Sequence, residues 1–398
     1  MTALLCPWDP YICLMDTGAF FDAFPPVGKA EWLAAVEKSL KGKTTLDALV
    51  WQAEGGLAVS PWVHADDFAV APAPMTEAPL DWEISETVAV EDDLPAAHAL
   101  VHDALRFGAE GLALLFDPAI NADRLARVLE GVHLDFVGLH LHDASPAPLP
   151  AAAALDLLGR VAAQNGLETQ QLRGTVAFQP YMTSGMVDWR YAADLVDMAS
   201  ARFPGFRVLG ARGNERDEDG VVQELADLLR IGNDYLTQLN ERGISPAQTA
   251  RQIHFTLAIG ERYFLEMAKL RAFRQLWLNV LNAWEAPLQY PYISVVFKPQ
   301  TYTDDLYTNM IRATTMAMSA VLGGADRLTV LPYDFGRENP AGYPPAFGRR
   351  IARNVQHLLK MEGHLTEALD PMAGSYYLEQ LTNTITEQAW ERFKQPEE

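Results

Sequence analysis

The chain has 398 residues, 49% of them hydrophobic and 10% aromatic, which is enough to bury one large core or two smaller ones and argues against disorder. Its 52 acidic and 31 basic residues give a formal net charge of −21, which disfavours nucleic acid as a partner, because phosphate binding needs a concentrated basic surface. Only two cysteines (Cys6 and Cys13), no signal-peptide pattern and no apolar run near the ~18 residues of a membrane span predict a cytoplasmic protein without membrane contact.

Residues 1–90 are predicted to form an extended N-terminal arm with one amphipathic helix. A proline-rich stretch near the end of this segment favours extended chain over helix. The helix is predicted from Ala30 to Lys41, and Gly42 is its natural stop. Its apolar residues recur at helical spacing: Trp32, Leu33, Val36 and Leu40. This apolar stripe needs a surface to pack on, either the main domain or another subunit.

Residues 91–398 are predicted to form an α/β domain, a (β/α)8 TIM barrel. Short apolar runs suited to buried parallel strands alternate with segments of helical period. The eight runs begin near Leu112, Leu134, Thr175, Arg207, Ile253, Ile293, Leu328 and Leu365. Together they span about 250 residues, the usual size of such a barrel. The alternative is an open doubly wound sheet, but its Gly-rich first turn is missing from the sequence.

Two groups of polar residues in the predicted barrel are candidate sites. His140 and His142 alternate at the end of a strand, so both side chains point to one face. No other His or Cys cluster supplies a third ligand, and we therefore predict no metal site. The loop Ala211–Gly220 is either a polar rim of an active site or, as such a charge run favours, a solvated loop. Neither a G-x-S-x-G elbow nor a Walker-type loop occurs, so these hydrolase classes lack support.

The segment DPMAGSYYLE, residues 370–379, is the most informative stretch of the chain. Asp-Pro forces a turn, Gly374 supplies a permissive backbone, and Ser375 is predicted to cap a helix that opens at Tyr376. The segment resembles the closing motif of the substrate barrel in the methylmalonyl-CoA mutase family. Three further stretches carry the same resemblance in the family's order: FDAFPPVGKAEWLAAVEKSLKG, ERYFLEMAKLRAFRQLW and RRIARNVQHLL.

This resemblance implies a cofactor and a reaction. Members of the family interconvert methylmalonyl-CoA and succinyl-CoA by radicals generated from adenosylcobalamin. Their barrel admits the CoA chain, and a separate C-terminal domain carries the cobalamin. None of the nine histidines here lies in the D-x-H-x-x-G cobalamin signature. We therefore expect no cobalamin-binding domain in this chain, and adenosylcobalamin bound by the partner subunit of the assembled enzyme.

The chain departs from the family at three catalytic segments. The family's Gly-Tyr-His aligns with Gly213, Asn214 and Glu215, so the phenol and the imidazole are lost. An ionised Glu would oppose the partial negative charge of a thioester carbonyl, which an imidazole can stabilise. The other two motifs, Arg-Gln-Tyr and Arg-Thr-His-Ser, are replaced by Ser85, Glu86 and Thr87, and by Val296, Phe297, Lys298 and Pro299. No catalytic residue is expected.

The sequence thus favours a noncatalytic small (beta) subunit of a heterodimeric methylmalonyl-CoA mutase, which supports a catalytic large subunit. The arm around Trp32 is the candidate contact with that partner. Four phenylalanines are candidates for closing the axial passage of the barrel: Phe136, Phe178, Phe255 and Phe297. Two alternatives remain. The chain is a catalytically active acyl-CoA mutase barrel with cobalamin supplied by another chain, or it is a binding module for CoA esters.

Overall fold

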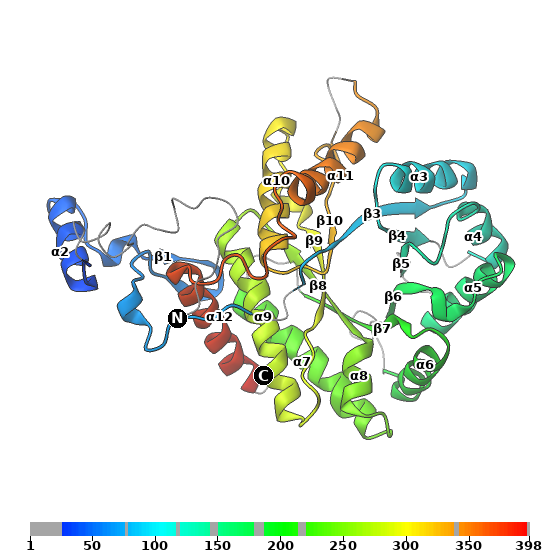
Figure 1. The fold of residues 1–398 in the computed structure, drawn as a ribbon, viewed down its shortest axis with the longest axis horizontal. Helices are drawn as coiled ribbons and strands as arrows, with labels where there is room; N and C mark the ends of the chain where they lie inside the picture. The colour runs from blue at the N-terminus through cyan, green and yellow to red at the C-terminus, as the bar shows by residue number, and fades with distance from the viewer. Residues whose placement is uncertain are drawn as a thin grey trace, which may run out of the picture. The chain divides into compact units, whose positions relative to one another are not determined.

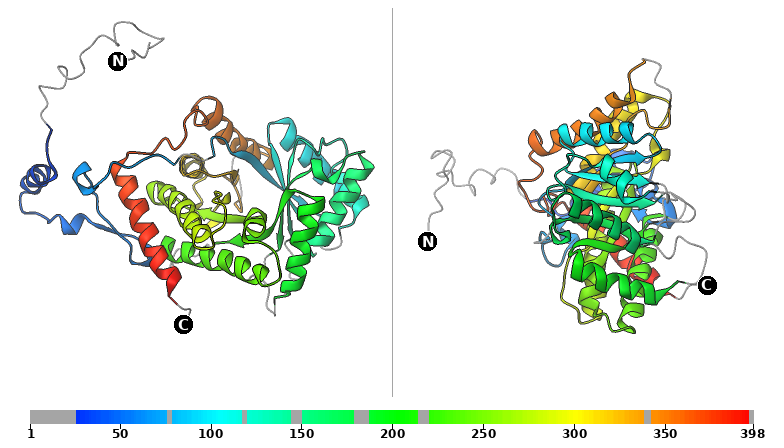
Figure 2. Two further views of the ribbon diagram at one scale, coloured as in Figure 1. Left: turned by 60° about the horizontal axis from the view of Figure 1, so that its bottom comes forward. Right: turned by 90° about the vertical axis from the view of Figure 1, so that its right-hand side faces the viewer.

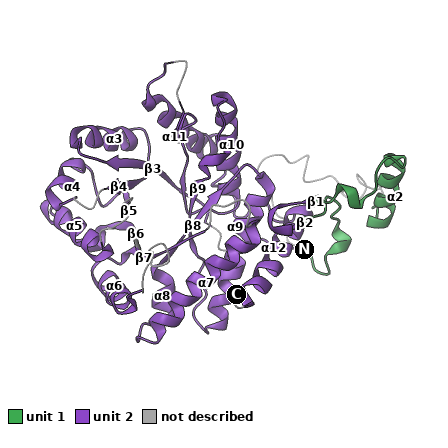
Figure 3. Cartoon of the chain, turned by 180° about the vertical axis from the view of Figure 1, so that it is seen from behind, with its two compact units in different colours: residues 1–51, 58–71 green, residues 52–57, 72–398 purple. Residues whose placement is uncertain are grey.

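The structure is a computed structural model, and it describes residues 26–75, 79–116, 120–143, 150–178, 187–213, 220–337 and 342–395. The chain divides into two compact units, one of residues 1–51 and 58–71 and the other of residues 52–57 and 72–398 (Figure 3). Among the described helices, none combines the length and the hydropathy that crossing a bilayer requires.

The larger unit is a closed barrel of eight parallel strands with helices outside them (Figures 1 and 2). In order around the barrel the strands are β10 Arg327–Thr329, β3 Glu83–Val90, β4 Gly111–Phe116, β5 Gly138–Asp143, β6 Arg173–Phe178, β7 Gly205–Arg212, β8 Ile253–Ile259 and β9 Tyr292–Phe297. The (β/α)8 fold that the sequence predicts is confirmed.

In the described part of the larger unit, ten helices follow the strands in the chain. They are α3 Leu94–Arg106, α4 Ala122–Val128, α5 Ala151–Gln164, α6 Trp189–Arg202, α7 Gly220–Asn240, α8 Pro246–Gln252, α9 Tyr263–Ala283, α10 Leu306–Leu322, α11 Pro345–Met361 and α12 Tyr376–Lys394. Short 3-10 helices lie at η3 Glu54–Gly56, η5 Thr169–Gln171 and η8 Pro299–Thr301. The last helix, α12, packs on α7 and α9.

One of the eight predicted strands is wrong. The run at Leu365 forms turns and bends, and the remaining strand of the barrel is β3, which lies in the segment predicted as the arm. The other seven runs match β4 to β10. The barrel closes where β10 pairs with β3, with Arg327 opposite Glu83. β3 escaped detection because polar residues at alternate positions interrupt its apolar run, as expected of a strand with one face on a polar barrel interior.

The closing motif holds a buried arginine of α9. The Arg271 guanidinium forms ion pairs with Asp370 and, at 3.0 Å, with Glu379. Gly374 has φ +82° and donates its N–H to Glu379 Oε1 at 3.0 Å, and α12 begins at Tyr376, as the sequence predicts. The predicted cap is wrong, because the Ser375 side chain makes no capping hydrogen bond. The motif therefore anchors α12 to α9 through charge.

The smaller unit contains α2 Lys29–Leu40, which matches the predicted helix to within one residue at each end. Its first N–H group donates to Asp66 Oδ2 at 2.9 Å, and Trp32 packs edge-on against Trp62 with ring centroids 5.8 Å apart. No residue of α2 is buried. Four shorter elements follow α2 in the chain: η2 Asp47–Leu49, β1 Trp51–Gln52, β2 Ala58–Val59 and η4 Ala65–Asp67.

Candidate functional site

A pocket of about 350 Å³ lies at the carboxyl ends of β8 and β9, within the larger unit. This is the end of a TIM barrel at which active sites occur. Its walls come from the start of α7, the loop between β8 and α9, and the segment from β9 to α10. Lys298, which replaces part of a family motif, follows β9 directly and donates its N–H to the Ile259 carbonyl at 2.9 Å.

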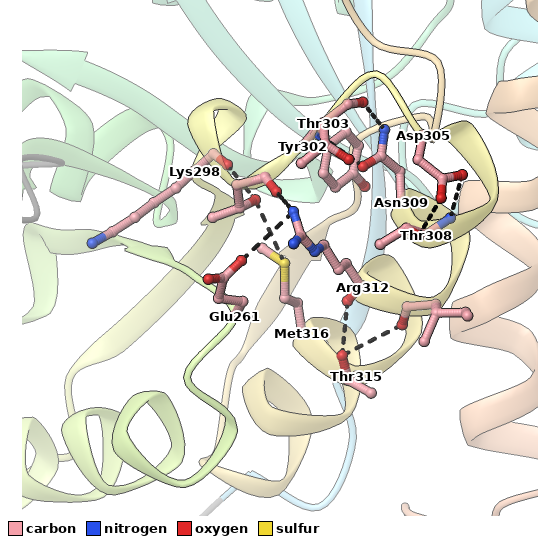
Figure 4. Close-up of polar contacts among 12 residues, drawn as sticks. Glu261, Lys298, Tyr302, Thr303, Asp305, Thr308, Asn309, Arg312, Thr315 and Met316 are labelled. Atoms are coloured by element: carbon pink, nitrogen blue, oxygen red, sulfur yellow. Dashed lines mark hydrogen bonds and ion pairs between the residues drawn. The ribbon is translucent and has the colours of Figure 1, made fainter. Parts of the chain in front are cut away.

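The segment after β9 is held by its own polar groups (Figure 4). The Lys298 carbonyl accepts hydrogen bonds from the Thr301 N–H at 3.1 Å and the Thr301 hydroxyl at 2.7 Å. Arg312 of α10 donates to the Thr301 carbonyl and lies 3.7 Å from a carboxylate oxygen of Glu261. The guanidinium therefore fastens α10 to both loops that border the pocket.

Two further side chains fix the beginning of α10. Asn309 is fully buried, and its amide donates to the carbonyls of Thr303 at 2.8 Å and Tyr333 at 3.0 Å. Asp305 caps α10, and hydrogen bonds from Thr308 hold the pKa of its carboxyl below the usual value. These polar groups serve the loop itself and are not available to a substrate.

A buried lysine pairs with two carboxylates that line the pocket. Lys269 Nζ lies 2.7 Å from Glu266 Oε2, 3.0 Å from Glu224 Oε2 and 2.7 Å from the Ala258 carbonyl. Burial would lower the pKa of Lys269, but the two carboxylates outweigh it and raise the pKa above its usual value. Burial raises the pKa of Glu224. We refer to Lys269, Glu224 and Glu266 as the Lys269 cluster.

The chemistry available in this pocket is limited. Arg262 pairs with Glu54, and the Lys269 cluster is paired within itself. Among the described residues that line the pocket there is no histidine, tyrosine or cysteine. Histidine, cysteine and unpaired carboxylates are common general acids, general bases and nucleophiles, and lysine and threonine also serve in these roles. The described lining therefore lacks an imidazole, a phenol and a thiol, and most of its charged groups are paired.

The segment aligned with the family's Gly-Tyr-His begins at this pocket. Gly213 follows β7, and its N–H donates to the Thr256 carbonyl at 2.9 Å. A Cβ atom at Gly213 would lie 2.5 Å from Glu224 Oε1, so the position favours glycine. Asn214 and Glu215, together with the charged loop as far as residue 219, lie outside the described residues. Their predicted roles stay predictions.

Of the three residues at the Arg-Gln-Tyr position, Glu86 points away from the barrel axis. It forms an ion pair with Arg353 of α11, and Arg349 lies 3.5 Å from its other oxygen. Burial raises the pKa of Glu86. By alternation along β3, Ser85 and Thr87 face the axis. The position therefore contributes a structural ion pair and two small hydroxyl groups.

The predicted phenylalanine plug is wrong. Phe136 precedes β5 and is 72% exposed. Phe178 packs against Tyr191 of α6, and Phe255 packs against Trp277 of α9 at 4.9 Å, so both face the outer helices. Phe297 points the same way, because Tyr292, Ser294 and Val296 occupy the axis-facing positions of β9. The phenylalanines on these strands face the helices, and the axis-facing positions carry polar and smaller apolar side chains.

His140 and His142 do face one side, as predicted, and that side is the barrel axis. His140 Nε2 lies 2.5 Å from Glu83 Oε1, and its Nδ1 lies 3.0 Å from the Thr175 hydroxyl. Burial, followed by nearby arginines, lowers the pKa of both histidines well below the usual value, while burial raises the pKa of Glu83. Over the described part of the chain, no three His, Cys, Asp or Glu side chains are placed to hold a metal ion.

Sequence reasoning missed most of the polar groups inside the barrel. Arg207 stacks on the Tyr292 ring at 4.3 Å, and His254 and Arg327 are buried beside them. Their signal in the sequence is a polar residue among apolar ones near the start of a strand, as in IHFTLAI and RLTV. That pattern predicts an axis-facing position, but not which strands bring such residues together.

Adenosylcobalamin, which the family resemblance implies, does not fit the described pocket. A volume of about 350 Å³ is at the lower end of the ~300–1,000 Å³ that holds drug-sized ligands, and cobalamin is larger than these. The charged side chains around the pocket are largely committed to one another. No catalytic step through the cofactor follows from these residues.

The sequence profile of the methylmalonyl-CoA mutase family matches residues 93–398. A methylmalonyl-CoA mutase small subunit of Porphyromonas gingivalis is 31% identical over 94% of this chain and 63% of its own length. One of Streptomyces virginiae is 32% identical over 96% of this chain and 66% of its own length. A methylmalonyl-CoA mutase of Rhizobium meliloti is 27% identical over 90% of this chain and 56% of its own. The chain thus spans about two thirds or less of the length of these relatives.

Proposed function

Because this chain belongs to the methylmalonyl-CoA mutase family, we propose that it is the noncatalytic small subunit of a heterodimeric mutase. In this proposal it supports a catalytic large subunit that interconverts methylmalonyl-CoA and succinyl-CoA with adenosylcobalamin. Two relatives named as small subunits, each more than 30% identical to this chain, support the assignment. The assembly is proposed to be cytoplasmic, in keeping with the two cysteines of the chain.

The observation that carries the proposal is the composition of the pocket at the carboxyl ends of the strands. Its described lining has no imidazole or phenol, and the Lys269 cluster occupies one of its walls. Lys298 stands where the family motif would place one of its Arg-Thr-His-Ser residues. A rearrangement at a thioester is assisted by hydrogen-bond donors, such as an imidazole, that stabilise charge on the carbonyl oxygen. The fixed ion pairs support a structural role for this end of the barrel.

The proposal assigns the partner contact to the N-terminal arm. The apolar face of α2 carries Trp32, Leu33, Val36 and Leu40, and none of these residues is buried. A helix with an apolar face that its own chain leaves partly exposed gains stability by packing on another surface. The large subunit is the proposed surface, and it is also the proposed site of adenosylcobalamin.

Co-expression of this chain with candidate large subunits tests the assembly. We expect a stable heterodimer on size-exclusion chromatography, and loss of the complex at micromolar concentration when Trp32→Asp is introduced. Lys38→Asp, on the same helix, is the matched control and should leave the complex intact. Failure of every large subunit to bind the unaltered chain would contradict the assembly.

Activity is tested separately with the purified chain, adenosylcobalamin, an isolated cobalamin-binding domain and methylmalonyl-CoA. We expect no succinyl-CoA from this mixture, and turnover only when the large subunit is added. Formation of succinyl-CoA without the large subunit would instead support the alternative, an active barrel that uses cobalamin from another chain.

A further inference from the structure

Polar side chains from five strands converge inside the barrel. β7 contributes Arg207, β8 contributes His254, β10 contributes Arg327, and two serines stand on β3 and β9, Ser85 and Ser294. Strand pairing places them together: Tyr292 is opposite His254, Ser294 is opposite Arg327, and β3 pairs with β10 on its other side. We call Arg207, His254, Arg327, Ser85 and Ser294 the axis cluster.

The axis cluster has donors that no acceptor satisfies. Arg327 is 2% exposed and His254 is 1% exposed. Among the described residues, Arg327 Nη1, both ring nitrogens of His254 and the hydroxyls of Ser85 and Ser294 have no hydrogen-bond partner. A buried polar group without a partner costs free energy, and a buried charge costs considerably more. These groups therefore call for a ligand or for ordered water between them.

The charge of the cluster favours an anion. Arg207 and Arg327 are both cationic, and the axis carboxyl group that acts on Arg327, Glu83, makes its close contact with His140 instead. Arg207 uses the face of its guanidinium against the Tyr292 ring, which does not occupy its N–H donors. His254, near both arginines, has no hydrogen-bond partner at either ring nitrogen and supplies one N–H donor when neutral.

The barrel interior is exposed to solvent at the axis-facing positions next to this cluster. Thr87 and Ala89 occupy the next axis-facing positions of β3 beyond Ser85, and both are exposed. Solvent therefore reaches the interior from the carboxyl end of that strand. At the opposite end Glu83 keeps 17% of its side chain exposed.

We propose that the axis cluster is a binding site for a compact oxyanion, a phosphate or a carboxylate, held by Arg327 and Arg207 with His254, Ser85 and Ser294 as further donors. Guanidinium groups match the oxygen geometry of both anions. A ligand with one small anionic group satisfies several donors at once. A pantetheine chain threaded along the axis would leave the arginines without a counter-charge, so the site is distinct from a CoA passage and does not depend on the proposed subunit role.

Binding of named anions to the full chain tests the site. Thermal unfolding and calorimetric titration are measured with inorganic phosphate, with succinate and with CoA, at constant ionic strength set by sodium chloride. We expect a saturable rise in Tm and saturable heat with phosphate, with succinate, or with both, and the stronger of the two identifies the source of the oxyanion. Equal Tm in phosphate, succinate and chloride would overturn the proposal, and so would binding of CoA without binding of phosphate or succinate.

Substitution locates the binding in the axis cluster. Arg327→Met is expected to weaken anion binding at least tenfold and, in the absence of anion, to raise Tm, because it removes a buried charge whose Nη1 has no hydrogen-bond partner. Arg251→Met, on the exposed face of α8, is the matched control and should change neither quantity. If Arg327→Met does not fold, Arg207→Met is measured, with the same tenfold loss expected. Unchanged anion affinity in the folded variant would overturn the site.

Discussion

The two buried charge clusters of this barrel are built in opposite ways. In the Lys269 cluster one cation meets two carboxylates and a backbone carbonyl, all within 3.0 Å. In the axis cluster two arginines, a histidine and two serines face one another, with unsatisfied donors on four of the five. The first cluster carries its own counter-charges, whereas the second depends on something that the chain does not supply.

This difference distinguishes buried charges that hold the fold together from buried charges that are placed to bind a ligand. A satisfied buried ion pair fixes neighbouring elements, here α7, α9 and the end of β8, and breaking it exposes a charge to a medium that solvates it poorly. Donors without acceptors instead lower stability until a ligand or water reaches them. The paired charges of the Lys269 cluster lie at the carboxyl end of the barrel, where the active sites of enzymes with this fold occur. The unpaired donors of the axis cluster lie in the barrel interior.

Removal of Lys269 should produce the largest effect. Lys269→Met leaves Glu224 and Glu266 buried together without the lysine that pairs with both, and we expect a loss of about 3–5 kcal/mol in the free energy of unfolding. Urea denaturation at pH 7.5 measures it. The loss should shrink as the pH falls, because the stranded carboxylates then take up a proton.

Lys394→Met is the matched control for that change. Lys394 is half exposed and pairs with Glu391 at 2.6 Å on the surface of α12. Surface pairs contribute ~0–1 kcal/mol, so this variant should unfold almost like the unaltered chain. Equal losses in the two lysine variants would show that the Lys269 cluster is not a buried ion-pair network.

The buried His254 is expected to lower the stability of the chain at acid pH. Burial, followed by Arg327 and the other nearby cationic groups, holds the pKa of His254 well below the usual value of 6.5. Below pH 6.5 the unfolded chain takes up a proton at this position and the folded chain does not, so stability falls as the pH falls, by at most ~1.4 kcal/mol per pH unit. In His254→Asn this contribution disappears.

The test compares the two chains between pH 6.5 and pH 5, where the variant should lose about 1–2 kcal/mol less than the unaltered chain. Buried carboxyl groups with raised pKa values, Glu83, Glu86 and Glu224, act in the opposite direction in both chains. Their contribution cancels in the difference. His364→Asn, on an exposed turn, is the control and should keep the slope of the unaltered chain. A variant with the unaltered slope would show that His254 is not held neutral.

The sequence predicts a strand of this barrel when the strand is an apolar run, and it fails when the strand's inner face is polar. β8 and α9 were predictable, because IHFTLAI is a short apolar run and the 21 residues of Tyr263–Ala283 have a helical period. β3 was not, because Glu83, Ser85 and Thr87 break its apolar run. A strand with a polar inner face looks like a loop until the barrel that encloses it is known.

The sites show the same limit. Comparison with the family's motifs singled out Lys298 and Gly213 in the sequence, and the pocket lies beside both residues. The axis cluster gathers residues between 85 and 327, and only closure of the barrel brings them together. Periodicity assigns each side chain to a face, but it cannot assign partners across strands that are far apart in the chain. Charge balance inside a barrel is therefore a property of the fold.

The smallest effect is expected at Glu83, which contacts His140 and acts electrostatically on Arg327 of the axis cluster. Burial raises the pKa of Glu83 and lowers that of His140, and Glu83 Oε1 lies 2.5 Å from His140 Nε2, within hydrogen-bond distance. Glu83→Gln keeps a hydrogen-bonding side chain of similar shape and removes the carboxyl group, and the cost should stay within ~1.5 kcal/mol by urea denaturation at pH 7. Glu83→Ala, which leaves His140 without this partner, should cost more than Glu83→Gln. If Glu83→Gln instead cost the ~3–5 kcal/mol of a broken buried ion pair, Glu83 would be the counter-charge of the arginines, and the axis cluster would need no anion from outside.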